Sequence, residues 1–196
     1  MDDTLGIYID IDNEARLVAR CRMIAKRQHS TSSFEYDASW LAYDGRFALD
    51  PQNLPLTNNP IFTRHEKSSL PGAIRDTAPD RWGQKLIKRA FAKSGLDRTP
   101  TEFDYLLAIN DETRIGALRY KRPGETDFDH DIEGYRVPPL IQLPALLDAV
   151  NAVSNDSDTD ADLRLLLNEG SPLGGARPKS AVQDGEHLAI AKFPKP

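Results

Sequence analysis

Apolar residues alternate with polar residues through the first third of the chain, which restricts that part to β-structure. The alternation runs through residues 5–9, 15–24 and 33–36, and residues 12–14 supply a turn between the first two segments. A two-residue period is typical of a strand with one buried face, so we predict three short strands. Residues 44–72 are rich in proline and glycine turn dipeptides, which predicts a connection with room for one short strand.

After these strands the apolar spacing changes to the period of a helix. The segment 77–80 predicts a helix start, with Thr77 as the N-cap and the carboxylate of Asp80 three residues later. Residues 99–102 repeat the pattern, with Pro at the first helical position and Glu at the third. An apolar stripe follows each start, and we assign both stripes to the core rather than to a cofactor site. Their members are Trp82, Leu86, Ile87, Ala90 and Phe91, then Phe103, Leu106 and Leu107.

The remaining part of the chain shows both the two-residue period of strands and the period of helices. We predict a strand at 115–120, a polar loop at 121–136 and a helix from 143 to about 153. A further helix, capped by Thr159 to Asp162, ends at Gly170. Strands first, helices next and a final hairpin together predict an α+β fold.

Composition narrows the function classes. The chain has 196 residues with 25 basic and 30 acidic side chains, a formal charge of -5. This balance disfavours a general nucleic-acid or anionic-membrane binder. A single cysteine, Cys21, excludes an internal disulfide framework and a cysteine-based zinc site. We expect a cytoplasmic protein, because the start is acidic rather than signal-like and no apolar run approaches the roughly 20 residues of a membrane helix.

Two charged segments admit alternative interpretations. The predicted helix after Pro79 has five basic residues, which would suit a phosphate or an acidic partner, or form an ordinary solvated surface. We favour the solvated surface. The acidic run between 156 and 162 lacks the glycine and glutamate of an EF-hand loop, so we interpret it as a solvated linker and a helix cap. The basic residues are Arg81, Lys85, Lys88, Arg89 and Lys93.

A glycine-rich segment at 170–182 is the main candidate for chemistry. Gly174 and Gly175 allow backbone amides to approach a phosphate, and Arg177 and Lys179 add positive charge. The segment is not a Walker A loop, because a proline precedes the lysine where glycine is required. From these residues alone, a phosphate loop and an ordinary glycine-rich turn remain equally open.

The residues that follow favour the phosphate interpretation. Asp184-Gly185 predicts a tight hairpin turn before a strand at 187–193. In that strand Lys192 shares a face with Leu188 and Ile190, where an unpaired ammonium would be costly. A bound phosphate or a carboxylate would offset that cost. The alternative is a lysine whose ammonium extends to water.

These motifs resemble the HipA family, the serine/threonine kinase toxins of type II toxin–antitoxin modules. The glycine segment and the last strand resemble the start of the HipA nucleotide-binding region, and upstream segments resemble the HipA amino-terminal subdomain. The segments that carry the resemblance are Gly170-Ser171-Pro172-Leu173-Gly174-Gly175-Ala176-Arg177-Pro178-Lys179, Ala189-Ile190-Ala191-Lys192-Phe193-Pro194, Asp76-Thr77-Ala78-Pro79-Asp80-Arg81-Trp82-Gly83, Phe103-Asp104-Tyr105-Leu106-Leu107 and Arg114-Ile115-Gly116-Ala117-Leu118.

The resemblance implies a domain plan and a set of site residues. It implies a mixed β/α subdomain at 1–120, a connecting loop and helices at 121–169, and the opening loop and hairpin of a kinase N-lobe related to the phosphoinositide kinases at 170–196. Ser171 would be an autophosphorylation site that controls access of ATP. The implied ATP-binding residues are Gly174, Gly175, Ala176, Arg177, Lys179 and Lys192.

The resemblance also implies partners and a limit on activity. The cofactors would be ATP and magnesium, and the partners a HipB-like DNA-binding antitoxin and an aminoacyl-tRNA synthetase as substrate. We expect no membrane and no direct nucleic-acid contact. No catalytic or magnesium-binding aspartate of the family has a match here, so we expect the amino-terminal portion of a kinase, inert by itself. The alternative is a stand-alone subdomain that docks on a separate HipA-type kinase or its antitoxin.

Overall fold

The computed structural model has two compact units, and each unit is formed by two separate segments of the chain. One unit comprises Met1–Ala78 and Gly116–Phe128, and the other comprises Pro79–Ile115 and Asp129–Pro196. The division at residues 120 and 169 stays a prediction. The structure describes residues 3–25, 30–63, 68–93, 98–109, 111, 114, 116–128, 143–169, 179–184 and 187–192.

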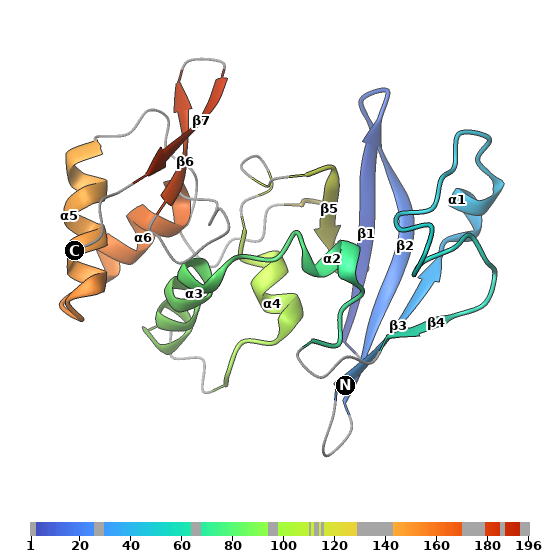
Figure 1. Ribbon diagram of the computed structural model, residues 1–196, viewed down its shortest axis with the longest axis horizontal. Coiled ribbons are helices and arrows are strands. Elements are labelled where there is room, and N and C mark those ends of the chain that lie inside the picture. The colour runs from blue at the N-terminus through green and yellow to red at the C-terminus, as the bar shows by residue number, and fades with distance from the viewer. Residues whose placement is uncertain are drawn as a thin grey trace. The chain divides into compact units, whose positions relative to one another are not determined.

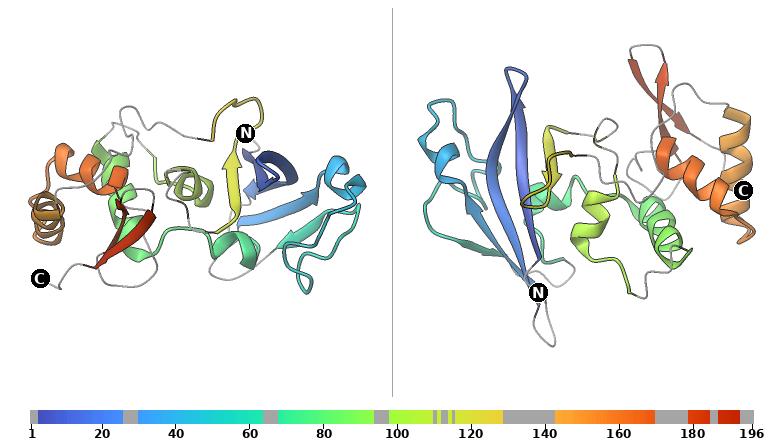
Figure 2. Two further views of the ribbon diagram at one scale, coloured as in Figure 1. Left: turned by 90° about the horizontal axis from the view of Figure 1, so that it is seen from above. Right: turned by 180° about the vertical axis from the view of Figure 1, so that it is seen from behind.

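The first unit is built on a five-stranded antiparallel sheet with the order β4-β3-β2-β1-β5 (Figure 1). Asp12 and Asn13 have φ angles of 54° and 62°, so the predicted turn between the first two strands has the left-handed backbone of a tight hairpin. Both views in Figure 2 show β5 beside β1, although about a hundred residues separate them. The strands are β1 (Asp3–Ile11), β2 (Glu14–Ala25), β3 (Ser30–Tyr36), β4 (Ile61–Thr63) and β5 (Leu118–Lys121).

One face of this sheet forms the core of the unit, as the two-residue period predicted. Alternate side chains of β1 to β3 and β5 are buried, and Cys21 is among them as a small strand residue. Two helices that were not predicted, α1 (Ala38–Ala42) and α2 (Gly72–Arg75), are too short to show a helical period in the sequence. The largest fully buried members of the unit are Trp40, Tyr120, Phe34, Leu5, Ile7, Leu54 and Ile74.

The second unit is mainly helical, and three of its helices share one core. The apolar stripe of α3 (Arg81–Lys93) packs with buried residues of α5 (Leu143–Ser154) and α6 (Asp160–Glu169). The first predicted stripe is therefore core, and the residues of the second stripe, on α4, are also buried. The predicted cap of α6 is confirmed, since the Thr159 hydroxyl accepts from the amide of Asp162 at 3.2 Å. The core residues are Leu86, Ile87, Ala90, Phe91, Leu146, Ala149, Val150, Val153, Leu163 and Leu166.

Two predicted helix caps are wrong in position. The carboxylate of Asp80 accepts from the Gly83 amide at 2.9 Å, so Asp80 rather than Thr77 caps α3. Thr77 is still part of the turn after α2, where its hydroxyl donates to the Ile74 carbonyl at 2.8 Å. Helix α4 (Glu102–Leu107) is capped by Thr101 with its partner Asp104, two residues later than predicted.

The last described element is a two-stranded antiparallel hairpin of β6 (Lys179–Asp184) and β7 (His187–Lys192). Its strands agree with the prediction of a turn at Asp184-Gly185 followed by a strand. The fold is therefore α+β as predicted, with one antiparallel sheet, a helical core and a separate hairpin.

Candidate functional site

Hairpin β6–β7 brings together two of the predicted phosphate-binding residues. Lys179 opens β6 and Lys192 ends β7, and the two residues are directly opposed in the register. Directly opposed residues of an antiparallel pair lie on the same face. The sequence could have shown this, because a two-residue turn after Asp184 fixes the pairing. The other predicted site residues lie outside the described residues: Ser171, Gly174, Gly175, Ala176 and Arg177.

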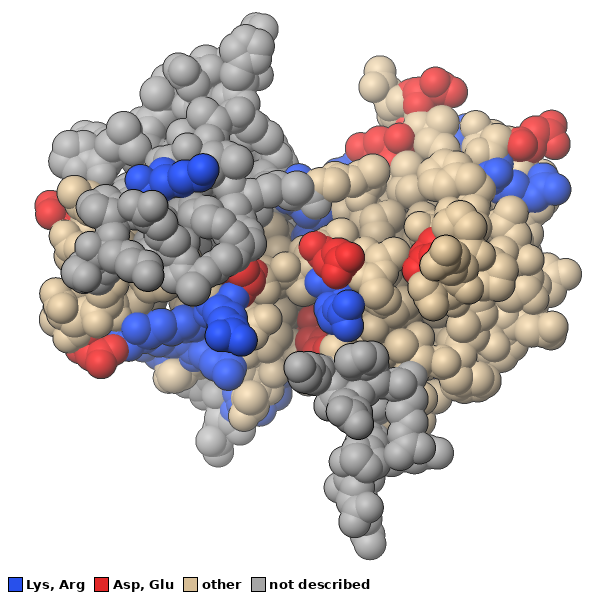
Figure 3. Space-filling view, in the orientation of Figure 1, with Lys and Arg blue, Asp and Glu red and all other residues tan. Residues whose placement is uncertain are grey.

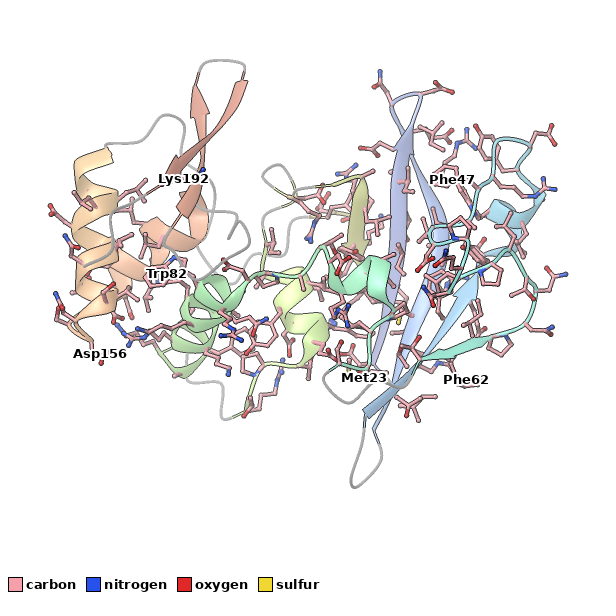
Figure 4. The ribbon with its side chains drawn as sticks, viewed as in Figure 1. Met23, Phe47, Phe62, Trp82, Asp156 and Lys192 are labelled. Carbon is pink, nitrogen blue, oxygen red and sulfur yellow. The ribbon has the colours of Figure 1, made fainter. Side chains whose placement is uncertain are left out.

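The exposure of Lys192 corrects one step of the sequence argument. Its side chain is exposed on β7 (Figure 4), so its ammonium is hydrated and needs no buried partner. The expected desolvation cost therefore does not require a bound anion. A different electrostatic reason takes its place: like charges directly opposite each other in a hairpin are destabilising, and an anion placed between them would remove that repulsion.

Three of the five basic side chains of α3 form ion pairs within the chain while remaining partly exposed to solvent. Lys85, Arg89 and Lys93 recur every fourth residue, so they lie along one face of the helix. We call these three side chains, together with Asp156, Asp158 and Asp160, the α3 clamp. Figure 3 shows Lys and Arg side chains gathered over α3 with acidic side chains beside them. This pairing neutralises part of the positive charge of α3, and Arg81 and Lys88 stay exposed beside it.

Asp158 is the centre of the α3 clamp. Its carboxylate accepts from Arg89 and, at 3.1 Å, from the Lys93 ammonium, and its side chain is only 3% exposed. Burial by itself would raise the pKa of Asp158, but the Lys93 hydrogen bond and the charges of Arg89 and Lys93 hold that pKa below its usual value. The predicted solvated linker is therefore a docked segment at this position.

The remaining members attach the turn between α5 and α6 to α3. Asp156 lies in this turn (Figure 4), where it contacts Arg89 and lies 3.9 Å from the Lys85 ammonium. Lys85 also donates to the Val153 carbonyl at 3.1 Å, close to the end of α5. Asp160, the first residue of α6, lies 3.8 Å from the Lys93 ammonium. The sequence contains a signal for this pairing: the basic residues of the clamp recur at every fourth position, and its acidic residues recur at every second position.

A second ionic group stabilises the start of α4. Asp104 accepts from the Thr101 amide at 2.7 Å and from Arg98 Nη2 at 3.0 Å. Burial acts to raise the pKa of Asp104, but Arg98 and Thr101 outweigh it and lower the pKa to about 2.

The low pKa of Asp104 predicts a loss of stability in acid. A carboxyl group with a depressed folded-state pKa stabilises the protein above its unfolded pKa of about 3.9 and loses that contribution as the pH falls toward 2. We expect Asp104→Asn to lower the free energy of unfolding by about 1 to 2 kcal/mol at pH 7, since the exposure of Arg98 screens part of the interaction. Urea unfolding at pH 7 and pH 3 measures this.

The same titration has an internal control. Asp148 is exposed on α5 of the same unit, so Asp148→Asn should change the free energy of unfolding by less than about 0.5 kcal/mol at either pH. At pH 3 the gap between the wild type and Asp104→Asn should shrink. A gap of the same size at both pH values would show that the ionised carboxylate is not what stabilises α4.

Comparison with known proteins decides the family. The family model of the HipA N-terminal domain matches residues 19–121. The chain belongs to the HipA N-terminal domain family. No curated protein matches it.

The match confirms the resemblance of the upstream segments to the HipA amino-terminal subdomain. The matched part of this HipA N-terminal domain runs from β2, through α1 to α4, to the end of β5. Hairpin β6–β7 and the α5 and α6 side of the clamp lie beyond it. Among the described residues of this HipA-family chain, no helix combines the length and apolarity needed to cross a membrane. No group of three acidic, histidine or cysteine side chains in that part of the chain could hold a metal ion.

Proposed function

We propose that this chain is the amino-terminal part of a HipA-type serine/threonine kinase toxin and supplies part of its ATP phosphate site. The observation that carries the proposal is the direct opposition of Lys179 and Lys192 in hairpin β6–β7. Two lysines opposed in the strand register, preceded in the sequence by adjacent glycines, suit the charge and the close approach of a polyphosphate. Membership of the HipA N-terminal domain family supports the kinase context.

The residues present fit the phosphates of ATP better than its magnesium. Lysines bind phosphate oxygens as positive point charges, whereas magnesium needs carboxylate ligands. ATP with magnesium supplies the transferable phosphoryl group in such kinases. The residues of this chain would bind and orient the phosphates, and the base and the metal ligands would come from a kinase lobe. Alone, the chain would be inert.

The regulatory and partner roles belong to the same proposal. Ser171 lies three residues before the adjacent glycines Gly174 and Gly175, so a phosphate on it would introduce charge next to the ATP phosphates and oppose their binding. The complete kinase would act on a substrate of the aminoacyl-tRNA synthetase class and be restrained by a HipB-like antitoxin in the cytoplasm.

The proposal predicts a loss of nucleotide affinity when Lys192 is removed. We expect Lys192→Ala to weaken binding of magnesium-ATP by about 10- to 100-fold, the value of one hydrogen bond to a charged group. Calorimetry on the full product of the reading frame measures this, with the 196-residue chain alone expected to bind weakly or not at all. Lys88→Ala is the matched control, because Lys88 is exposed on α3 of the same unit.

The opposite outcome has a definite meaning. If Lys192→Ala binds as tightly as the wild type, the phosphate role of the hairpin is wrong. If no form of the protein binds ATP, the chain instead fits a binding subdomain that docks on a separate kinase or antitoxin.

One observation favours that second function. Residues 47–63 include one charged side chain, Asp50, in a chain that is 28% charged. The exposed large hydrophobic residues of the described chain all lie in this stretch: Phe47, Leu56 and Phe62, with 46%, 40% and 63% exposure. Uncharged surface with exposed aromatic residues is typical of protein interfaces. Figure 4 shows Phe47 and Phe62 well apart, so the stretch offers separate contacts rather than one pocket.

A further inference from the structure

The α3 clamp is joined to the candidate phosphate hairpin through a short run of structure. Asp158 is two residues before α6, and the Thr159 hydroxyl and the Asp162 carboxylate cap that helix immediately afterwards. Leu163 and Leu166 of α6 are buried in the helical core with α3. Helix α6 also contacts β6, the strand that begins at Lys179 (Figure 1).

The hydrophobic core alone does not define this arrangement closely. Apolar burial is non-directional, so helices packed by aliphatic residues retain some freedom to slide and rotate. Charged hydrogen bonds impose direction and distance on the groups that they join. The three basic residues of the clamp span eight positions, or about 12 Å along α3, and therefore resist both sliding and rotation of the bound segment.

Given the phosphate role proposed for hairpin β6–β7, we infer that Asp158 is a positioning residue for ATP. Through Arg89 and Lys93, Asp158 holds the start of α6 on α3, and α6 in turn supports β6 with Lys179. Asp158 acts on the site through other residues and does not touch the nucleotide. Loss of its charge lets α6 and the hairpin shift, and a misplacement near 1 Å can cost about 100-fold in the rate of a reaction that depends on positioning.

The test compares charge-removing and charge-keeping variants of two ion pairs in the full product of the reading frame. Asp158→Asn removes the clamp charge, and Asp158→Glu keeps it. Asp10→Asn is the control, because Asp10 pairs with Arg119 at 2.9 Å in the sheet unit. We expect Asp158→Asn to weaken magnesium-ATP binding at least about tenfold at 20 °C, Asp158→Glu to restore part of the affinity, and Asp10→Asn to change it less than about twofold.

Each outcome decides the inference. If Asp158→Asn lowers the melting temperature but leaves the affinity for magnesium-ATP unchanged, the clamp is purely structural and the inference is wrong. If Asp10→Asn weakens binding equally, the effect reflects general destabilisation, which also overturns the inference. Should Asp158→Asn not fold, Lys93→Met, which retains the Arg89 pair, must show the loss of affinity instead. If Lys192→Ala is without effect, the proposed function fails first, and its failure is distinguishable from a failure limited to the clamp.

Discussion

Replacing Arg114 with leucine is expected to lower the free energy of unfolding by about 3 to 5 kcal/mol, the range for breaking a buried ionic group by removing one partner. The Arg114 side chain is 2% exposed, and its Nη2 donates to the carbonyls of Leu106 and Ile109 at 2.9 and 3.0 Å. These carbonyls lie at the carboxyl end of α4, where backbone acceptors have no partner within the helix. Its Nε lies 3.7 Å from the carboxylate of Asp111, whose side chain is 7% exposed.

Leucine at position 114 would leave two buried carbonyls and a nearly buried carboxylate without this cation. Chemical denaturation followed by circular dichroism measures the change. Arg75→Leu is the matched control, because Arg75 is 44% exposed and lies 3.9 Å from Asp76, which is 78% exposed. That exposed pair should contribute less than about 1 kcal/mol. Equal effects of the two substitutions would show that burial of Arg114 does not determine its contribution.

The second large effect is expected at Trp40, where alanine should cost about 3 to 5 kcal/mol. The Trp40 side chain is 1% exposed, and its ring lies 5.2 Å from that of Phe47 and 5.7 Å from that of Tyr43. Its Nε1 donates to the Phe47 carbonyl at 3.1 Å. Alanine would leave a cavity under α1 and release this carbonyl, so packing and hydrogen bonding would be lost together.

Two further variants separate these contributions. Trp40→Phe keeps an aromatic ring and removes the donor, so we expect a smaller loss of about 1 to 2 kcal/mol. Phe62→Ala removes a ring that is 63% exposed and should change the free energy of unfolding by less than about 0.5 kcal/mol. Urea titration of the three variants gives the ranking. A loss at Phe62 as large as that at Trp40 would mean that Phe62 is covered in solution.

Local patterns in the sequence predicted the elements whose signals are local. Alternation located β1 to β3, the Asp184-Gly185 turn located hairpin β6–β7, and helical spacing located α3 and α5. The caps of α3 and α4 were misplaced because several Thr and Asp residues stand within a few positions. Only the path of the chain after α2 selects Asp80 over Thr77. The identity of the residue that caps α3 therefore depends on α2, a helix too short to be predicted from the sequence.

The candidate site shows the same limit at longer range. The opposition of Lys179 and Lys192 follows from a two-residue turn, so it was accessible from the sequence. The pairing within the α3 clamp could not be predicted from the basic and acidic spacings alone, because Arg89 and Asp158 are separated by 69 positions and each occurs in a segment that looks solvated by itself. The sequence pattern predicted that the basic residues of α3 and the acidic residues between 156 and 162 both face solvent. Only the packing of α3 against α6 shows that these charges neutralise each other.

The sheet unit is formed by two segments that are far apart in the sequence, and this has a consequence for synthesis on the ribosome. Strands β1 to β4 are complete by residue 63, but β5, the neighbour of β1, begins only at residue 118. Until then the edge of β1 opposite β2 lacks its hydrogen-bonding partner, and Ile7 lacks the cover of Tyr120. Helices α3 and α4 are translated during that interval. The nascent sheet must therefore wait for a segment encoded after them before its last backbone hydrogen bonds can close.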